Sequence, residues 1–143
     1  MSGMRGCLRL YRLTLAAWIG LAVPALAQDN SALAAGKSVW NRGGCFNCHG
    51  DRAQGGGGSD YPVGPSLRNI GYDKATMAEV VSCGRPGTQM PAWLKGAYST
   101  VQCYGMPLGS MPEGMTVPAI FTADEIKALV DYIFGTFVQT PQR

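Results

Sequence analysis

The five residues Cys45-Phe46-Asn47-Cys48-His49 constrain the fold more than any other part of this sequence. Two cysteines separated by two residues and followed at once by a histidine form the pattern that attaches c-type haem. Each thiol forms a thioether with one vinyl group of the haem, and the histidine then lies beneath the iron as an axial ligand. The sequence therefore predicts a fold built around a covalent haem.

Two other uses of a Cys-x-x-Cys pair fit this sequence less well. A thioredoxin-like pair would follow a strand and would not need the histidine. A zinc ribbon would need a second ligand pair at similar spacing, and Cys83 and Cys103 are not arranged in that way. We therefore predict one haem c bound through Cys45 and Cys48, with His49 as an iron ligand.

The other axial ligand has to come from a different residue type, because His49 is the one histidine of the chain. The choices are a methionine, a weaker donor such as lysine or asparagine, water, or an empty position. Five methionines follow residue 27, and they are Met77, Met90, Met106, Met111 and Met115. Met77 falls in a stretch with a helical pattern, residues 74–82, and is expected to fill the core. The other four lie in a segment rich in glycine and proline, where a loop could cover the second haem face.

The first 27 residues have the features of an export signal. Three arginines precede a short apolar run, and the segment ends in Ala25-Leu26-Ala27, a typical signal peptidase site. The apolar run is shorter than the roughly 20 residues that span a bilayer as a helix. We expect residues 1–27 to be removed after Ala27, leaving a periplasmic domain of residues 28–143 with no stable membrane insertion. An uncleaved N-terminal anchor is the alternative.

The charge of the chain argues against a nucleic-acid partner. The sequence has 12 Lys and Arg and 9 Asp and Glu. Three of the arginines and none of the acids precede residue 28, so the remaining domain is formally neutral. It has no concentrated basic patch of the kind that binds nucleic acid.

The run from Gly84 to Pro91 resembles the ligand loop of the class I cytochrome c family, in which a Pro-Gly-Thr-x-Met sequence supplies the sixth ligand. The resemblance implies that Met90 is this ligand, and Pro86-Gly87 would form the tight turn before it. Met111 is the rival, because several small bacterial members of the family use a Met-Pro ligand before their last helix. Met106 and Met115 are further candidates, and a site without a methionine ligand is the last alternative.

Two helical stretches match the crossed first and last helices of the same family. We predict helices over residues 31–42, with Ser31 as the N-cap, and over residues 122–137, with a capping box at its start. The family crosses these helices through a glycine and a later aromatic on one and a Leu-x-x-aromatic pair on the other. The matching residues here are Gly36 with Trp40 and Leu129 with Tyr132. Thr122 and Glu125 form the capping box. The resemblance implies a small all-α fold of the cytochrome c type.

Gly64-Pro65-Ser66-Leu67 resembles a further family segment, in which the proline carbonyl accepts a hydrogen bond from the ligand histidine. The resemblance implies this role for Pro65. Such a bond fixes the orientation of the histidine ring and makes the ring a stronger electron donor to iron. The glycine-rich stretch 54–60 is not a phosphate-binding loop, because no Gly-Lys-Ser/Thr follows it. We expect it to be a flexible surface segment.

Cys83 and Cys103 are left over from haem attachment, and in an exported protein they are expected to form a disulfide. Closing a loop of about 20 residues would add roughly 3 kcal/mol by restricting the unfolded chain. The bond is also expected to fasten the loop that carries Met90. The long stretch that follows, residues 91–121, is expected to shield the haem edge or to form a docking surface.

A haem with histidine and methionine ligands has no open coordination position, and the sequence offers no evident acid–base pair for catalysis. We therefore expect a one-electron carrier rather than an enzyme. Its partners would be redox proteins, such as a dehydrogenase or a terminal oxidase or reductase. Two alternatives are a haem enzyme or ligand sensor with an open sixth position, and a dedicated cytochrome subunit of a periplasmic quinoprotein dehydrogenase.

Overall fold

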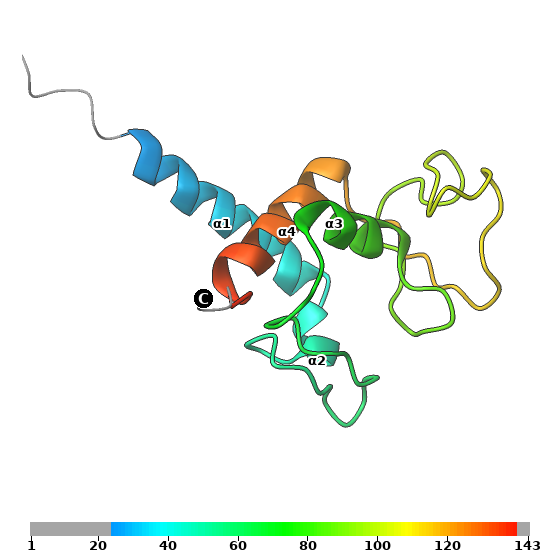
Figure 1. Ribbon diagram of the computed structural model, residues 1–143, viewed down its shortest axis with the longest axis horizontal. Coiled ribbons are helices and arrows are strands. Elements are labelled where there is room, and N and C mark those ends of the chain that lie inside the picture. Colours follow the sequence, from blue (N-terminus) through cyan, green and yellow to red (C-terminus); the bar gives the residue numbers. More distant parts are fainter. Residues whose placement is uncertain (1–23, 140–143) are drawn as a thin grey trace, which may run out of the picture.

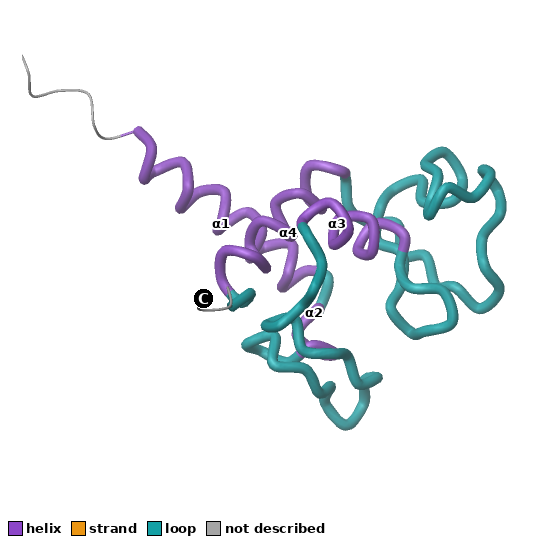
Figure 2. Tube along the Cα trace, viewed as in Figure 1, coloured by secondary structure: helices purple, strands orange, loops and turns teal. Residues whose placement is uncertain are grey.

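The computed structural model describes residues 24–139, and the charged and apolar parts of the predicted export signal lie outside these residues. Within that range the chain forms four helices and no strand longer than an isolated bridge. The helices are α1 (Pro24–Arg42), α2 (Cys45–His49), α3 (Lys74–Cys83) and α4 (Ala123–Thr136). Two glycines separate α1 from α2, and long loops join α2, α3 and α4 (Figures 1 and 2). The predicted all-α fold is confirmed for the described residues.

Helices α1 and α4 cross in close contact at Gly36. A Cβ added there would overlap the Ala128 carbonyl oxygen and the Cβ of Tyr132, so the crossing requires a glycine. The rings of Trp40 and Tyr132 pack beside it with centroids 6.3 Å apart. Leu129 lies 1% exposed in the same core. The predicted crossing of the first and last helices is therefore confirmed.

The start of α4 is fixed by the predicted capping box. The Thr122 hydroxyl accepts from the Glu125 backbone N–H, and the Glu125 carboxylate accepts from the Thr122 N–H at 2.8 Å. Arg42, at the end of α1, bonds the same carboxylate at 2.6 Å and lies over the Phe121 ring. These interactions lower the pKa of Glu125 to about 2. The hydrogen bond from the Thr122 backbone has the larger effect, and the bond from Arg42 has the next largest. This cluster joins the end of α1 to the start of α4.

The first helix is longer than predicted. It begins at Pro24 rather than at residue 31, so Ser31 lies inside α1 and is not its N-cap. Proline suits the first turn of a helix because its missing N–H would have no partner there, and the alanines that follow favour the helix. The expected cleavage point after Ala27 falls within the first turns of α1.

The core has two parts. The larger part joins α1, α3 and α4 and includes Met77, which is 3% exposed and fills the core as predicted. The smaller part lies under the loops after α3 and centres on Cys83, Tyr98 and Cys103. None of the helices in residues 24–139 is long and apolar enough to cross a membrane.

Candidate haem site

Helix α2 carries all three residues of the attachment motif within a single short turn. Gly43 and Gly44 separate it from α1, and Gly44 has φ +61°, a conformation that glycine adopts without strain. A Cβ at Gly43 would lie 3.2 Å from both Cys45 Sγ and the Phe121 ring. The two glycines therefore let the chain turn tightly from α1 into the motif, with Cys45 held close to the core.

Cys45 and Cys48 are both partly exposed free thiols. Burial raises the pKa of the Cys45 thiol to about 12, and burial also raises the pKa of Cys48. Burial lowers the pKa of His49, against the opposing effect of its hydrogen bond to Pro65. The neutral imidazole, which is the form that binds a metal, is thus favoured at neutral pH.

The His49 ring is oriented by one backbone carbonyl. Its Nδ1 lies 2.8 Å from the Pro65 carbonyl oxygen, so Nδ1 carries the proton and donates it. Nε2 is then the nitrogen with a lone pair for iron. This is the contact that the family resemblance implied for Pro65.

Gly64 is a site residue that our sequence reasoning did not single out. A Cβ at this position would lie 2.9 Å from His49 Nδ1 and 2.8 Å from the Cys48 carbonyl oxygen. The Gly64 N–H also donates to that carbonyl at 2.9 Å. A glycine directly before the proline of the Gly-Pro-x-Leu segment was the available signal for a close backbone approach.

Residues 54–60 lie at the surface as predicted, and their glycines also make backbone hydrogen bonds to the attachment motif. The Gly55 N–H donates to the His49 carbonyl at 2.7 Å, and the Gly58 N–H donates to the Asn47 carbonyl at 3.0 Å. A helix of one turn leaves its last carbonyls without partners inside the helix. The glycine-rich stretch supplies those partners and so forms part of the support of α2.

The four loop methionines lie in different surroundings. Met90 is partly buried and packs against the larger core, as Cys45 does. Met106 and Met115 instead pack against the smaller core. Met111 is 52% exposed. Met90 is therefore the loop methionine that shares a core with the attachment helix.

The loop that ends in Met90 is closed by its own hydrogen bonds. The Arg85 N–H donates to the Met90 carbonyl at 3.0 Å, and the Thr88 hydroxyl donates to the Arg85 carbonyl at 2.8 Å. The Met90 N–H donates in turn to the Thr88 hydroxyl oxygen at 3.2 Å. These bonds form a compact turn directly after α3. Cys83, at the end of α3, is joined to Cys103 by a disulfide with an S–S distance of 2.06 Å.

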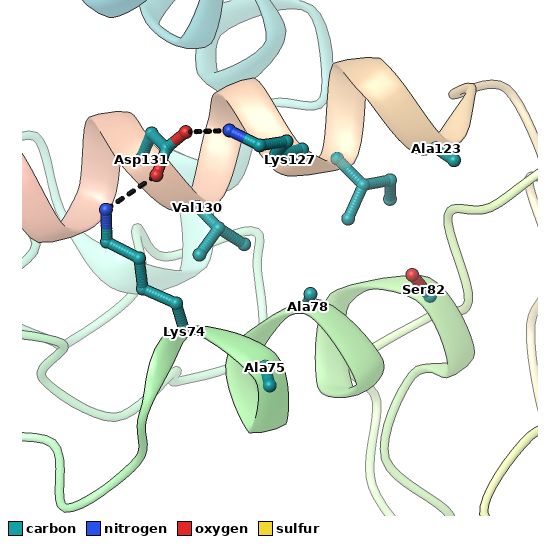
Figure 3. A pocket seen from close by; sticks show the side chains of 9 residues that line it. Lys74, Ala75, Ala78, Ser82, Ala123, Lys127, Val130 and Asp131 are labelled. Carbon is teal, nitrogen blue, oxygen red and sulfur yellow. Dashed lines mark hydrogen bonds and ion pairs between the residues drawn. The ribbon is translucent and has the colours of Figure 1, made fainter.

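An open groove of about 540 Å³ lies elsewhere, between α3 and α4 (Figure 3). Its floor includes Ala78 and Val130, and at one end Asp131 bonds Lys74 at 2.6 Å and Lys127 at 2.7 Å. None of the predicted haem residues lines it. The groove is a surface feature of the helix pair and is separate from the haem site.

The residues of the site fit a covalent haem. The thiols of Cys45 and Cys48 and the oriented imidazole of His49 lie on one short helix. The side chain of Met90 belongs to a closed loop that packs against the same core. These are the donor types that c-type haem uses for attachment and for axial ligation.

Comparison with known proteins agrees with this chemistry. The family described as "Cytochrome C oxidase, cbb3-type, subunit III" matches residues 31–106, more than half of the chain. Two relatives are named "Cbb3-type cytochrome c oxidase subunit CcoP". The protein of Azospirillum sp. (strain B510) is 44% identical over 48% of this chain and 25% of its own length. That of Azospirillum brasilense is 40% identical over 47% and 24%. The match thus spans about a quarter of each relative, and no solved structure matches the chain.

Proposed function

Because the chain belongs to the family of cbb3-type cytochrome c oxidase subunit III, and is thus a haem-binding electron-transfer cytochrome, we propose that it is an exported one-electron carrier with a single haem c. Cys45 and Cys48 hold the haem, His49 is the proximal ligand and Met90 is the sixth ligand. The observation that carries the proposal is the shared core: the attachment helix and the closed Met90 loop pack against one hydrophobic cluster.

Two further facts favour Met90 over Met111. Met90 lies inside the segment that matches the family, whereas Met111 lies beyond its end. Met111 is more than half exposed, whereas Met90 is partly buried against the larger core. Met90 already lies in a loop closed by hydrogen bonds.

The chain's residues hold both faces of the site in place. The Pro65 carbonyl fixes the His49 ring, and the turn between Arg85 and Met90 fixes the backbone of Met90. Haem iron supplies one-electron oxidation and reduction. Ligands held rigidly on both sides change little between redox states, which suits electron transfer and leaves no position for a substrate. We therefore propose a carrier rather than an enzyme.

The partner is proposed to be a redox enzyme of the periplasmic side. The two relatives are named as oxidase subunits, which supports a terminal oxidase as the acceptor. In the alternative, the chain is a bound subunit of a periplasmic dehydrogenase, and that enzyme supplies its electrons. Both roles need the same one-electron chemistry at the same haem.

The proposal is tested on the protein purified from the periplasm of a host that attaches c-type haem. We expect one covalent haem per chain and an N-terminus at Gln28, with both thioethers lost in Cys45→Ala plus Cys48→Ala. The reduced wild-type protein should not bind CO at once. Immediate CO binding would contradict the carrier proposal and favour the haem enzyme or sensor.

A further inference from the structure

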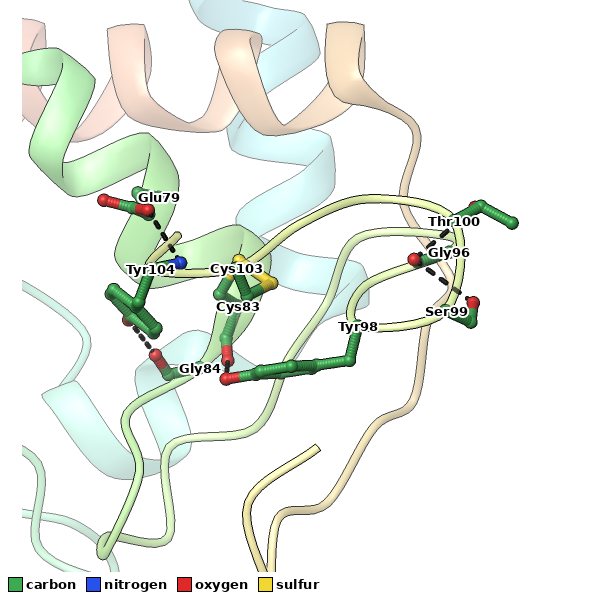
Figure 4. The surroundings of a disulfide bond; sticks show 9 residues. All are labelled: Glu79, Cys83, Gly84, Gly96, Tyr98, Ser99, Thr100, Cys103 and Tyr104. Atoms are coloured by element: carbon green, nitrogen blue, oxygen red, sulfur yellow. Dashed lines mark hydrogen bonds between the residues drawn. A yellow bond between two sulfur atoms is a disulfide. The ribbon is translucent and has the colours of Figure 1, made fainter. Parts of the chain in front are cut away.

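The base of the Met90 loop is held by two tyrosines from the long segment that follows it. Tyr98 donates its hydroxyl to the Cys83 carbonyl at 2.9 Å, and this bond is buried. Tyr104 donates its hydroxyl to the next carbonyl, that of Gly84. The two rings reach these adjacent carbonyls from opposite sides of the disulfide (Figure 4).

The disulfide and the Tyr104 hydroxyl join two short stretches of chain, residues 83–84 and residues 103–104. Cys83 is bonded to Cys103, and the residues that follow each of them, Gly84 and Tyr104, are joined by a hydrogen bond. The Tyr104 backbone N–H also donates to the Glu79 carboxylate on α3 at 3.0 Å. The segment is thus attached to the last turn of α3 and to the first residue beyond it.

Both tyrosines adopt an unfavourable backbone conformation. Tyr98 has φ +63° and Tyr104 has φ +53°, and only Ala53 and Ala119 share a positive φ among the non-glycine residues described in 24–139. Bulky residues rarely adopt this region, and they stay there only where the surroundings fix them. The hydroxyl bonds are such fixed contacts. Burial also raises the pKa of both hydroxyls, so both are protonated donors at neutral pH.

The Cys83 and Gly84 carbonyls, which accept the two tyrosine hydrogen bonds, lie at the start of the loop that ends in Met90. Gly84 has φ +69°, and a Cβ there would lie 2.7 Å from the Met90 carbonyl oxygen and 2.8 Å from the Ala92 nitrogen. The next residue, Arg85, donates its N–H to that same Met90 carbonyl. A shift of Gly84 would therefore displace the backbone of Met90 directly.

We propose that Tyr98 and Tyr104 are positioning residues for the sixth ligand, which hold the base of the Met90 loop and so limit how often the thioether leaves the iron. This proposal rests on Met90 being that ligand. The tyrosines touch neither the haem-attachment residues nor Met90 itself in the contacts described, and they act through the Cys83 and Gly84 carbonyls.

The test measures how fast imidazole replaces the sixth ligand in the oxidised holoprotein. Imidazole binds only when the methionine is off, so its binding rate reports the open fraction of the loop. The hydrogen bond lost in Tyr98→Phe or in Tyr104→Phe should raise this rate about fivefold, and the double variant should raise it about twenty-fold. Tyr132→Phe, which removes a hydroxyl in the α1–α4 contact, is the matched control and should leave the rate unchanged.

Four outcomes decide the question. Faster imidazole binding in the two loop variants, with the methionine-to-iron absorption band still present at rest, supports the proposal. Rates within twofold of the wild type overturn it, as does an equal change in Tyr132→Phe. A wild type that lacks the methionine band and binds imidazole without delay overturns the proposed Met90 ligation, and this inference with it. Tyr104 is 38% exposed, so its phenylalanine variant keeps the test available if Tyr98→Phe does not fold.

Discussion

Replacing Gly64 by alanine should disturb the proximal side of the haem site. The added Cβ would lie 2.8 Å from the Cys48 carbonyl oxygen, and 2.9 Å from both the Cys48 carbonyl carbon and His49 Nδ1. Two of these atoms are backbone and cannot rotate away, so either α2 or the segment around Pro65 has to move. Overpacking of this kind costs about 2 kcal/mol, and losing the His49–Pro65 bond adds about 1 kcal/mol.

The same change should alter the reduction potential. With His49 as the proposed iron ligand, the bond to the Pro65 carbonyl would make the ring a stronger electron donor and so favour ferric iron. Its loss should then raise the potential by a few tens of millivolts, because ~60 mV corresponds to a tenfold change for one electron. Spectroelectrochemistry measures the potential, and urea unfolding measures the stability. Gly58→Ala is the control, since a Cβ there meets nothing within 4 Å. A Gly64→Ala protein with wild-type potential and stability would refute this reasoning.

Three further predictions concern stability. Gly36→Ala should lower the free energy of unfolding by about 2 kcal/mol, because the overlap with α4 outweighs the gain in helix propensity. Gly135→Ala is the control and should not lower it, because a Cβ there would meet only the end of a leucine side chain at 3.0 Å. Urea unfolding compares the two. Replacing Cys83 and Cys103 together by alanine should cost roughly 3 kcal/mol in the same assay and should weaken retention of the methionine ligand; unchanged ligand retention would show that the disulfide does not fasten the loop. The folded-state pKa of Glu125 is about 2 against an ordinary 4.5, so its contribution to stability is full above pH 4.5 and is lost as the pH falls toward 2. Glu125→Gln should therefore reduce the loss of stability measured across that window.

The sequence was most informative where a single residue type is required by chemistry or by close contact. The attachment motif coincides with the short helix α2, which the sequence did not predict as a separate helix, and Gly36 with Trp40 located the helix crossing. The Thr122–Glu125 pair marked the start of α4 correctly because a capping box is a purely local arrangement. Such features can be recognised without knowledge of the rest of the chain.

The sequence was least informative where contacts between distant segments decide the structure. The glycines of residues 54–60 have the composition of a mobile loop, and their role as donors to α2 depends on how the chain returns beneath that helix. The hydroxyls of Tyr98 and Tyr104 likewise find partners only after the disulfide brings two stretches together. We predicted the start of α1 at residue 31 because Ser31 is a typical N-cap residue. The helix begins earlier because the residues before Ser31 also favour a helix.

The most direct test of the account is the visible and near-infrared spectrum of the oxidised and reduced holoprotein, compared with those of Met90→Ala and Met111→Ala. The account predicts a low-spin haem in the wild type, with a weak far-red methionine-to-iron band that disappears in Met90→Ala and persists in Met111→Ala. Loss of the band only in Met111→Ala would contradict the assignment of the ligand loop. A high-spin wild type that binds CO at once would contradict the carrier function itself.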